Sequence, residues 1–380
     1  MQQSLPIWAK PSDYLKVQQT DHPVLFFSPQ VLQATARRFI DGFPGLVTYA
    51  VKANPDDMVL QNLAAAGVRA FDVASVDEIE RVRRLMPGAA MHYNNPVRSK
   101  AEVARAVALG VRSFSVDSSS ELEKALDFAP DGTEISVRFR LDLAGAAYDF
   151  GEKFGVDHDE AVELLGKIAV AGMTPSMTFH PGTQCTDPTT WEGYIAEAGR
   201  IVDEAGIEIS RLNDGGGFPS RRLDDENHDL EEIFEAIDRA TEAAFGNNRP
   251  ALVCEPGRGL VAECVSLAAR VRAVRDDNDV FLNDGVYGGF AEALLIGNVD
   301  RIEVRTHRGV QRDGERRDRI LFGPTCDSLD RFPGQASLPE GIAEGDFVIF
   351  HGMGAYSTVT ATRFNGFGQW EVATVRELTG

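Results

Sequence analysis

Several polar residues stand directly after short apolar runs of the sequence, where a side chain could take part in chemistry. Lys52 ends VTYAVK, His180 lies in TFHPG, and Glu255 and Arg258 belong to CEPGR. A lysine that is held partly out of water has a lowered pKa and becomes an amine nucleophile toward carbonyl groups. Taken alone, Lys52 could equally extend its ammonium group into solvent.

A triple glycine, Gly215 to Gly217, provides a second chemical signal together with Arg258. Glycines let backbone N–H groups approach an anion closely, and arginine adds a planar set of hydrogen-bond donors. Three glycines alone are often only a tight turn. Combined with the arginine, they indicate a phosphate site.

Glu255, His180 and Asp72 could complete a site for a flat cofactor. A carboxylate facing a pyridine nitrogen keeps that nitrogen protonated, so that the ring can accept electrons from a carbanion. His180 could stack on such a ring, although a single histidine is more often a hydrogen-bonded structural residue. Asp72 could orient these groups or cap the next helix. Lysine, phosphate site, pyridinium partner and stacking histidine together indicate pyridoxal 5'-phosphate, which none of them does alone.

The elements that must position these residues are eight short β-rich runs that alternate with amphipathic helical stretches. The runs span residues 46–52, 70–75, 90–95, 113–118, 134–140, 175–182, 209–217 and 251–258. Several helical stretches begin with Ser-x-x-Glu capping boxes: Ser75 with Glu78, Ser99 with Glu102, and Ser118 with Glu121. Eight β-then-α units predict a parallel (β/α)8 barrel over residues 24–258, with its active site at the C-terminal ends of the strands. The loops after strands 7 and 8 of such barrels commonly bind phosphate, which fits GGG and EPGR.

The pattern changes beyond about residue 260. The short strand-like runs DVFLND, RIEVRTH, DRILFGP and DFVIFHG are separated by turns rich in Gly and Asp. They predict a second, mostly β domain over residues 259–380, which residues 1–23 could join. Residues 308–319, RGVQRDGERRDR, are expected to form a polar loop.

The composition and net charge of the chain argue against several classes of protein. The formal net charge of −20 argues against binding to nucleic acid or to an anionic membrane, and it tolerates a cationic small substrate. No apolar run approaches the ~20 residues of a membrane span, and the first residues lack the features of a signal peptide, so a cytoplasmic protein is expected. Four scattered cysteines suggest reduced thiols, and clustered metal ligands are missing from the sequence.

Eight motifs carry a family resemblance, in this order: YAVKAN, FDVAS, FHPGTQC, GGGFP, CEPGR, DGVYGGF, GPTCDSLD and MGAYS. They closely resemble the barrel-type pyridoxal-phosphate decarboxylases, which share the alanine-racemase-like fold, and among these the ornithine decarboxylases and their bacterial lysine/ornithine relatives. The resemblance implies that Lys52 forms the Schiff base with the cofactor, that His180 stacks on its ring, and that Glu255 pairs with the ring nitrogen. The cofactor contacts that it further implies are Asp72, Thr183, Gly215, Gly216, Gly217, Arg258 and Tyr356.

The GPTCD motif resembles a family segment that reaches across a dimer interface into the partner's active site. By this resemblance Cys326 protonates the carbanion and Asp327 binds the distal amine of the substrate. Asp284 and Tyr287 of NDGVYGGF are expected to add substrate contacts. The resemblance therefore implies a homodimer with shared active sites that decarboxylates a basic L-amino acid, ornithine to putrescine and also lysine to cadaverine. One methylene is typically worth only ~1–3 kcal/mol, so dual activity is expected.

Three alternatives compete with this interpretation. A decarboxylase for diaminopimelate or another diamino acid would share the fold, but the diaminopimelate version usually carries a glutamate where this chain has Asp327. An alanine-racemase-like enzyme would carry an arginine in place of Glu255. A catalytically inactive, decarboxylase-like regulatory protein would have lost cofactor residues that this chain retains.

Two motifs depart from the family pattern. FHPGT stands where FHVGS is usual, so that Thr183 replaces a serine. LNDGGGFP stands where LDIGGGFP is usual: Asn213 replaces an aspartate, and Asp214 replaces an apolar residue. Asp214 adds a carboxyl group beside the predicted phosphate loop, and its charge there requires an explanation.

Overall fold

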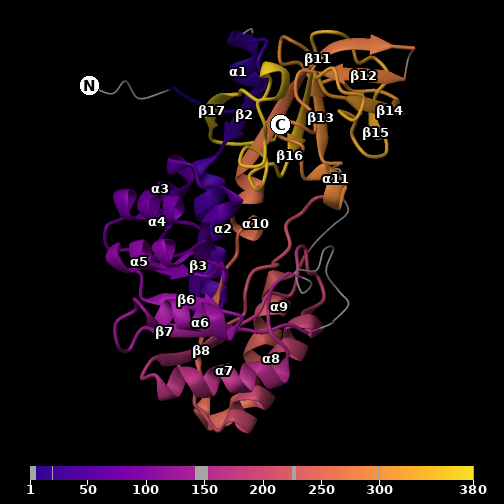
Figure 1. Cartoon of the computed structure of the whole chain (residues 1–380). Helices are drawn as coiled ribbons and strands as arrows, with labels where there is room; N and C mark the ends of the chain where they lie inside the picture. The colour runs from indigo at the N-terminus through magenta and orange to yellow at the C-terminus, as the bar shows by residue number, and fades with distance from the viewer. Residues whose placement is uncertain are drawn as a thin grey trace. The chain divides into compact units, whose positions relative to one another are not determined.

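The structure, a computed structural model, describes residues 6–18, 20–141, 153–224, 228–276, 278–297 and 300–379. The chain forms two compact units, which can be followed by colour in Figure 1. The barrel unit comprises Ala36–Pro219 and His228–Leu260. The β unit comprises Met1–Thr35, Ser220–Asn227 and Val261–Gly380.

Eight parallel strands close into a barrel, as the alternating sequence pattern predicts. They are β3 (Leu46–Ala50), β4 (Ala70–Val73), β5 (Ala90–Tyr93), β6 (Ser113–Val116), β7 (Glu134–Arg138), β8 (Thr174–Thr178), β9 (Arg211–Asn213) and β10 (Ala251–Cys254). Each strand pairs with the next along the chain, and β10 pairs with β3 to complete the ring. All eight strands are shorter than the predicted runs, so Lys52, His180 and Glu255 lie just beyond strand ends, where barrel active sites form.

Helices connect the strands of the barrel. They are α3 (Asp57–Ala66), α4 (Val76–Leu85), α5 (Lys100–Ala108), α6 (Ser119–Leu126), α7 (His158–Val170), α8 (Pro188–Ala205) and α9 (Leu230–Phe245), with α2 (Pro29–Gly42) before β3 and α10 (Arg258–Val261) after β10. The serine half of each predicted capping box is confirmed: Ser75, Ser99 and Ser118 each accept a hydrogen bond from the N–H of the glutamate three residues later. Of the three predicted boxes, the one at Ser99 is complete, whereas Glu78 accepts the N–H of Ala74 and Glu121 that of Arg98. Each such cap typically stabilises its helix by about 1 kcal/mol.

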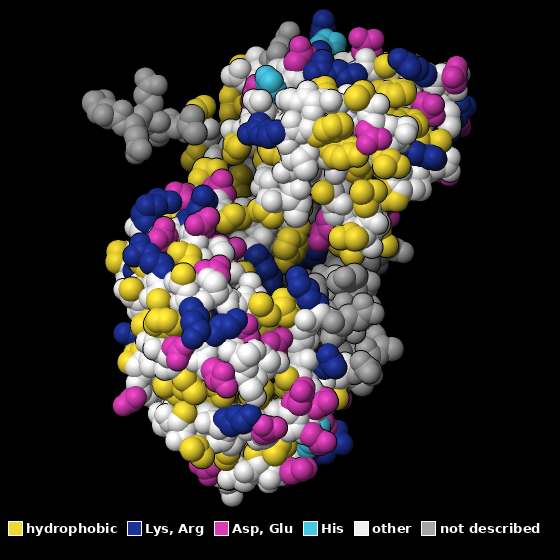
Figure 2. All heavy atoms as spheres, viewed as in Figure 1, with side chains coloured by type: hydrophobic (Ala, Val, Ile, Leu, Met, Phe, Trp, Pro, Cys, Tyr) yellow, Lys and Arg dark blue, Asp and Glu magenta, His cyan; other side chains and the backbone are white. Residues whose placement is uncertain are grey.

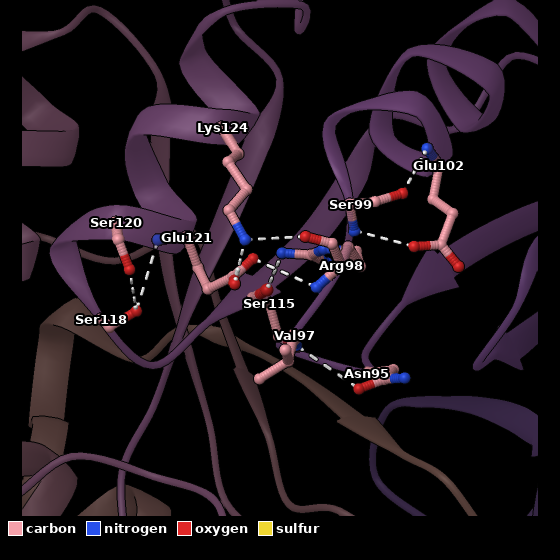
Figure 3. A network of polar contacts seen from close by, with 10 residues as sticks. All are labelled: Asn95, Val97, Arg98, Ser99, Glu102, Ser115, Ser118, Ser120, Glu121 and Lys124. Atoms are coloured by element: carbon pink, nitrogen blue, oxygen red, sulfur yellow. Dashed lines mark hydrogen bonds and ion pairs between the residues drawn. The ribbon is translucent and has the colours of Figure 1, made fainter.

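A buried arginine joins the loop after β5 to its neighbours (Figure 3). The Arg98 guanidinium donates to the carbonyl oxygen of Ser115 at 2.5 Å. It also donates to the carbonyl oxygen of Tyr93 at 3.0 Å. Glu121 Oε2 accepts the N–H of Arg98 at 3.2 Å, and Lys124 donates to the Arg98 carbonyl oxygen at 2.8 Å. These contacts hold residues 94–99 at the C-terminal ends of β5 and β6, and so position Asn94.

The β unit is built on a nine-stranded sheet with the order β1-β17-β2-β11-β12-β14-β15, in which β16 pairs with β11 and β13. Its elements are β1 (Ile7–Trp8), α1 (Pro11–Val17), β2 (Val24–Phe27), β11 (Val265–Arg275), β12 (Asp279–Leu282), α11 (Ala293–Ile296), β13 (Ile302–Arg305), β14 (Arg316–Phe322), β15 (Ala336–Pro339), β16 (Phe347–His351) and β17 (Glu371–Val375). A cluster of buried side chains, among them Phe26, Phe347 and Ile349, forms its core.

Two local expectations need correction. Strand β2 pairs with β11 and β17, so residues 24–27 belong to the β unit although the sequence pattern placed the start of the barrel at residue 24. Residues 316–319 belong to β14 and pair with β15, although they were expected to be loop. In both places short-range pattern is a poor guide, because strand pairing is set by distant partners.

The face drawn in Figure 2 shows Lys and Arg side chains interspersed with Asp and Glu. Among the ranges that the structure describes, no helix combines the length and the apolar character needed to cross a bilayer. Within the same ranges, no group of three or more His, Cys, Asp and Glu side chains is arranged to hold a metal ion.

Candidate active site

The polar residues predicted from strand ends converge at one mouth of the barrel. Lys52 lies in a short 3-10 turn (Val51–Ala53) after β3, Asp72 within β4, His180 beyond β8 and Glu255 directly after β10. Together they line a cavity of about 200 Å³. The other residues that line it are Ala74, Asn94, Asn95, Arg138, Lys153, Phe154, Thr178 and Phe179. The structure thus brings the predicted lysine, aspartate, histidine and glutamate into a single site.

Burial is the main influence on the pKa values of Glu255 and Asp72, the two acids of this cavity. It raises the pKa of Glu255 to about 8, helped by the nearby charge of Asp72 and opposed by a hydrogen bond from Asn213 and the charges of Lys52 and Arg138. Burial likewise raises the pKa of Asp72, against the charges of Lys52 and Arg138. A cationic ligand near these acids would therefore favour their charged forms.

His180 is held as a neutral ring. Burial lowers its pKa well below the usual value, and the charges of Lys52 and Arg138 act in the same direction. The backbone N–H of Gly182 donates to His180 Nδ1 at 3.0 Å, so that nitrogen is an acceptor. A neutral imidazole in this place offers a flat face to a ring and adds no charge to the cavity.

The triple glycine packs so tightly against the segment after β8 that side chains are excluded. A Cβ atom on Gly215 would lie 2.1 Å from the carbonyl oxygen of Phe179, and one on Gly217 would lie 2.4 Å from that of Gly182. Both glycines have positive φ angles, 68° and 85°. This backbone cradle stands beside Glu255, whose N–H donates to the Gly215 carbonyl oxygen at 2.8 Å.

Arg258 and Thr183 complete the predicted phosphate residues of the barrel unit. Arg258 is 6% exposed and begins α10, three residues after Glu255. Thr183 is half-buried in the segment that packs on the glycines. Tyr356 belongs to the β unit, where its φ of 53° places it in the left-handed region.

The surroundings of Asp214 explain how its carboxyl group is accommodated beside the glycine loop. The residue is fully buried, and neither carboxyl oxygen has a hydrogen-bond partner among the described residues. Burial raises the pKa of its carboxyl group well above the usual value, which favours the neutral form. The extra negative charge beside the glycine loop, expected from sequence, is therefore disfavoured by burial.

A second group of predicted residues lies in the β unit. The hydroxyl of Tyr287 donates to Asp327 Oδ2 at 2.6 Å, and the N–H of Leu329 donates to Oδ1 at 2.9 Å. These two hydrogen bonds lower the pKa of Asp327. The neighbouring Cys326 is exposed, and its N–H donates to Asn365 Oδ1 at 3.1 Å. The group therefore presents a thiol next to an ionised carboxylate.

Asp284 differs from Asp327 in its surroundings. It is 1% exposed and accepts hydrogen bonds from Trp370 Nε1 at 2.7 Å and from the N–H groups of Gly285 and Gly289 at 2.9 and 3.3 Å. Burial raises its pKa to about 6 against these donors. Asp284 thus holds the turn that carries Tyr287, an arrangement that sequence analysis did not foresee.

Among the residues that sequence reasoning missed are Arg138 and Asn94, which line the cavity, and Glu78, on whose pKa the charges of Asp72 and Lys52 act. Arg138 ends β7 and Asn94 follows β5, so the signal that singled out Lys52 and Glu255 also applied to them. Glu78 was treated only as a capping residue. Its pKa is raised to about 7 by burial, and its side chain accepts the N–H of Ala74 at 2.7 Å.

Comparison with known proteins decides the family. The family described as "Pyridoxal-dependent decarboxylase, pyridoxal binding domain" matches residues 30–262. The chain belongs to this family. It is 33% identical over 329 residues to a lysine/ornithine decarboxylase from Selenomonas ruminantium, covering 84% of this chain and 81% of the relative. It is 31% identical over 342 residues to ornithine decarboxylase from Mus musculus, covering 84% and 73%.

A solved structure agrees with this assignment. The arginine decarboxylase of Paramecium bursaria Chlorella virus is similar with a TM-score of 0.86 and 28% identity, over 96% of this chain and 98% of the viral one. The chain is therefore a pyridoxal-phosphate-dependent amino-acid decarboxylase with an alanine-racemase-like fold.

The residues of the barrel mouth fit pyridoxal phosphate. The glycine cradle leaves no room for side chains, as the close approach of a phosphate requires, and Arg258 follows it in the next βα loop. Lys52 offers an amine, and Glu255 a buried acid whose charged form a protonated ring nitrogen would favour.

Proposed function

We propose that this decarboxylase acts on a diamino acid with a cationic side chain, on L-ornithine foremost and also on L-lysine. The observation that carries the proposal is the Tyr287–Asp327 pair beside Cys326. Asp327 accepts two hydrogen bonds that favour its charged form, which suits an ammonium group. The relatives named for lysine and ornithine support the same class of substrate.

The residues of the barrel unit would hold the cofactor. Lys52 would bind it covalently, neutral His180 would lie against its ring, and Glu255 would face its ring nitrogen. Gly215 to Gly217, Arg258, Thr183 and Tyr356 would bind its phosphate, and Asp72 would support the ring side. When bound, pyridoxal phosphate supplies an electron-poor ring that stabilises the charge left as the carboxylate departs.

The residues of the β unit would act on the substrate. The thiol of Cys326 would return a proton to the α-carbon, and Asp327 would bind the distal ammonium group. Tyr287 would orient Asp327 through its hydroxyl. In this proposal Asp284 acts through the turn that it holds, because its carboxyl group is covered by Trp370 and backbone N–H groups.

Product analysis tests the substrate assignment. Purified protein loaded with pyridoxal phosphate is incubated separately with L-ornithine, L-lysine, L-arginine and meso-diaminopimelate, and the amines formed are identified. We expect putrescine from ornithine and cadaverine from lysine. Agmatine as the main product would replace the proposed substrate by arginine, and no product from any of the four would contradict the assignment.

We further infer that the enzyme is a homodimer in which Cys326 and Asp327 serve the partner's barrel. The exposure of Cys326 in the single chain supports this. In this arrangement Lys52→Ala subunits alone should be inactive, and Cys326→Ala subunits alone should retain about 1% of the wild-type activity or less. Random mixing should restore about a quarter of the wild-type activity, because half of the dimers would be mixed and each would regain one complete site. No recovery would show that each chain completes its own site.

A further inference from the structure

Two asparagine amides converge on one oxygen of Glu255 inside the barrel. The Nδ2 groups of Asn94 and Asn213 both donate to Glu255 Oε1. Asn94 follows β5, Asn213 ends β9, and Glu255 follows β10. The exposed fractions of the three residues are only 9%, 5% and 7%. These hydrogen bonds are therefore shielded from competition with water.

Both amides are oriented as donors by their other contacts. The N–H of Gly215 donates to Asn213 Oδ1 at 3.0 Å, so the carbonyl end of this amide faces the glycine loop and Nδ2 faces Glu255. The Asn94 amide also forms a hydrogen bond with Asp72 that favours the charged form of that acid. A carboxylate can accept both amides at one oxygen, whereas a proton on that oxygen would remove an acceptor site.

We propose that Asn94 and Asn213 are positioning residues that hold Glu255 as a carboxylate and leave its Oε2 to meet the protonated ring nitrogen of pyridoxal phosphate. The proposal rests on the function proposed above for Glu255. Without donors, a buried carboxylate takes up a proton, because burial disfavours its charged form. Amides oppose this without a charge of their own, so the negative charge remains available to the ring.

The same geometry couples the ring site to the phosphate site. Asn213 contacts the Gly215 N–H with one end of its amide and Glu255 with the other. The Gly215 carbonyl oxygen in turn accepts the N–H of Glu255 at 2.8 Å. Loss of the Asn213 amide should therefore weaken the binding of pyridoxal phosphate more than loss of the Asn94 amide does.

The test compares wild-type holoenzyme with Asn94→Leu, Asn213→Leu and the double variant, and uses Glu255→Gln as a reference. Leucine has the same branched side-chain shape and number of heavy atoms as asparagine but neither donates nor accepts. The visible absorbance of the bound cofactor is titrated with pH, and the dissociation constant of pyridoxal phosphate is measured separately. Neither measurement requires a substrate.

Loss of the ring proton should raise the midpoint of this titration. It removes a positive charge near the nitrogen that joins Lys52 to the cofactor, so this nitrogen keeps its own proton to higher pH. We expect each single variant to shift the midpoint upward by about one pH unit, the size of one hydrogen bond to a charged group. The double variant should approach Glu255→Gln.

Asn95→Leu is the matched control. Asn95 lines the same cavity, but its amide donates to the Ala74 carbonyl oxygen and accepts the N–H of Val97, as Figure 3 shows for the latter. Its titration midpoint should remain at the wild-type value. Thermal unfolding of all variants identifies any that fail to fold, and either single variant then suffices for the comparison.

Two outcomes would overturn the proposal. One is a double variant that titrates like the wild type while Glu255→Gln is shifted, which would show that the amides do not control Glu255. The other is an unshifted Glu255→Gln, which would remove Glu255 itself as the ring partner. Failure to decarboxylate ornithine or lysine would contradict the proposed substrates alone, because the titration is independent of turnover.

Discussion

The carboxyl groups of the barrel mouth and those of the β unit respond to their surroundings in opposite ways. Burial raises the pKa values of Asp72 and Glu255, whereas hydrogen bonds from Leu329 and Tyr287 lower that of Asp327. A cationic partner such as a protonated ring would favour the charged forms of the barrel acids. Asp327 is charged beforehand and is ready for a mobile substrate. We infer that the acids of the barrel unit suit a resident cofactor and that Asp327 of the β unit suits an exchanging ligand.

The largest expected effect on activity is that of replacing Lys52, the proposed cofactor-binding lysine of the barrel unit. Lys52→Ala should abolish turnover together with the visible absorbance of covalently bound cofactor, because Lys52 is the amine proposed to bind the cofactor covalently. Absorbance spectra and product analysis check this. Lys167→Ala removes an exposed lysine of α7 and should leave both unchanged. Wild-type absorbance in Lys52→Ala would refute the assignment of Lys52.

The next effect addresses the chemical role of the β unit. Cys326→Ala should lower kcat by about 10²- to 10⁴-fold, the usual contribution of a group that transfers a proton, with little change in KM. Steady-state kinetics with the substrate found by product analysis measure it. A rise in KM at unchanged kcat would instead make Cys326 a binding residue.

A smaller effect concerns the charged carboxylate of the β unit. Asp327→Asn should raise KM for ornithine by about tenfold to a hundredfold, because a hydrogen bond to a charged partner is weakened. Tyr287→Phe should act in the same direction but less strongly, since Asp327 keeps its charge and loses one donor. Asp318→Asn, an exposed position in β14, is the control. Equal KM values for wild type and Asp327→Asn would contradict the proposal that Asp327 binds the distal ammonium group of the substrate.

The smallest effect on activity is expected at Asp214, the buried acid beside the glycine loop. Asp214→Val replaces an unpaired buried carboxyl group by an apolar side chain and should raise the free energy of unfolding at pH 7 by about 1–3 kcal/mol. Because the folded-state pKa is raised, Asp214 must hold a proton that the unfolded chain releases near pH 4. The advantage of the variant should therefore grow as pH rises above about 4, and urea unfolding across pH measures it. An advantage that is constant with pH would show that Asp214 is charged in the folded state.

The sequence by itself determined the barrel, because alternating strands and capped helices are local patterns. Ser75, Ser99 and Ser118 cap helices through residues only three positions away. It also located Lys52, His180, Glu255 and Arg258, because polar residues after apolar strands of a parallel barrel meet at one end. These residues together indicated the cofactor, and a resemblance in motifs added the residues of GPTCD.

Only the tertiary structure decided which polar groups touch. Asn94 and Asn213 lie 161 and 42 residues from Glu255, and barrel closure brings all three side chains together. Trp370 covers Asp284 from 86 residues away. Such contacts depend on the faces that different strands and loops present to one another, which spacing along the chain does not encode. Burial then sets the charge of each acid, and burial is a property of the assembled fold.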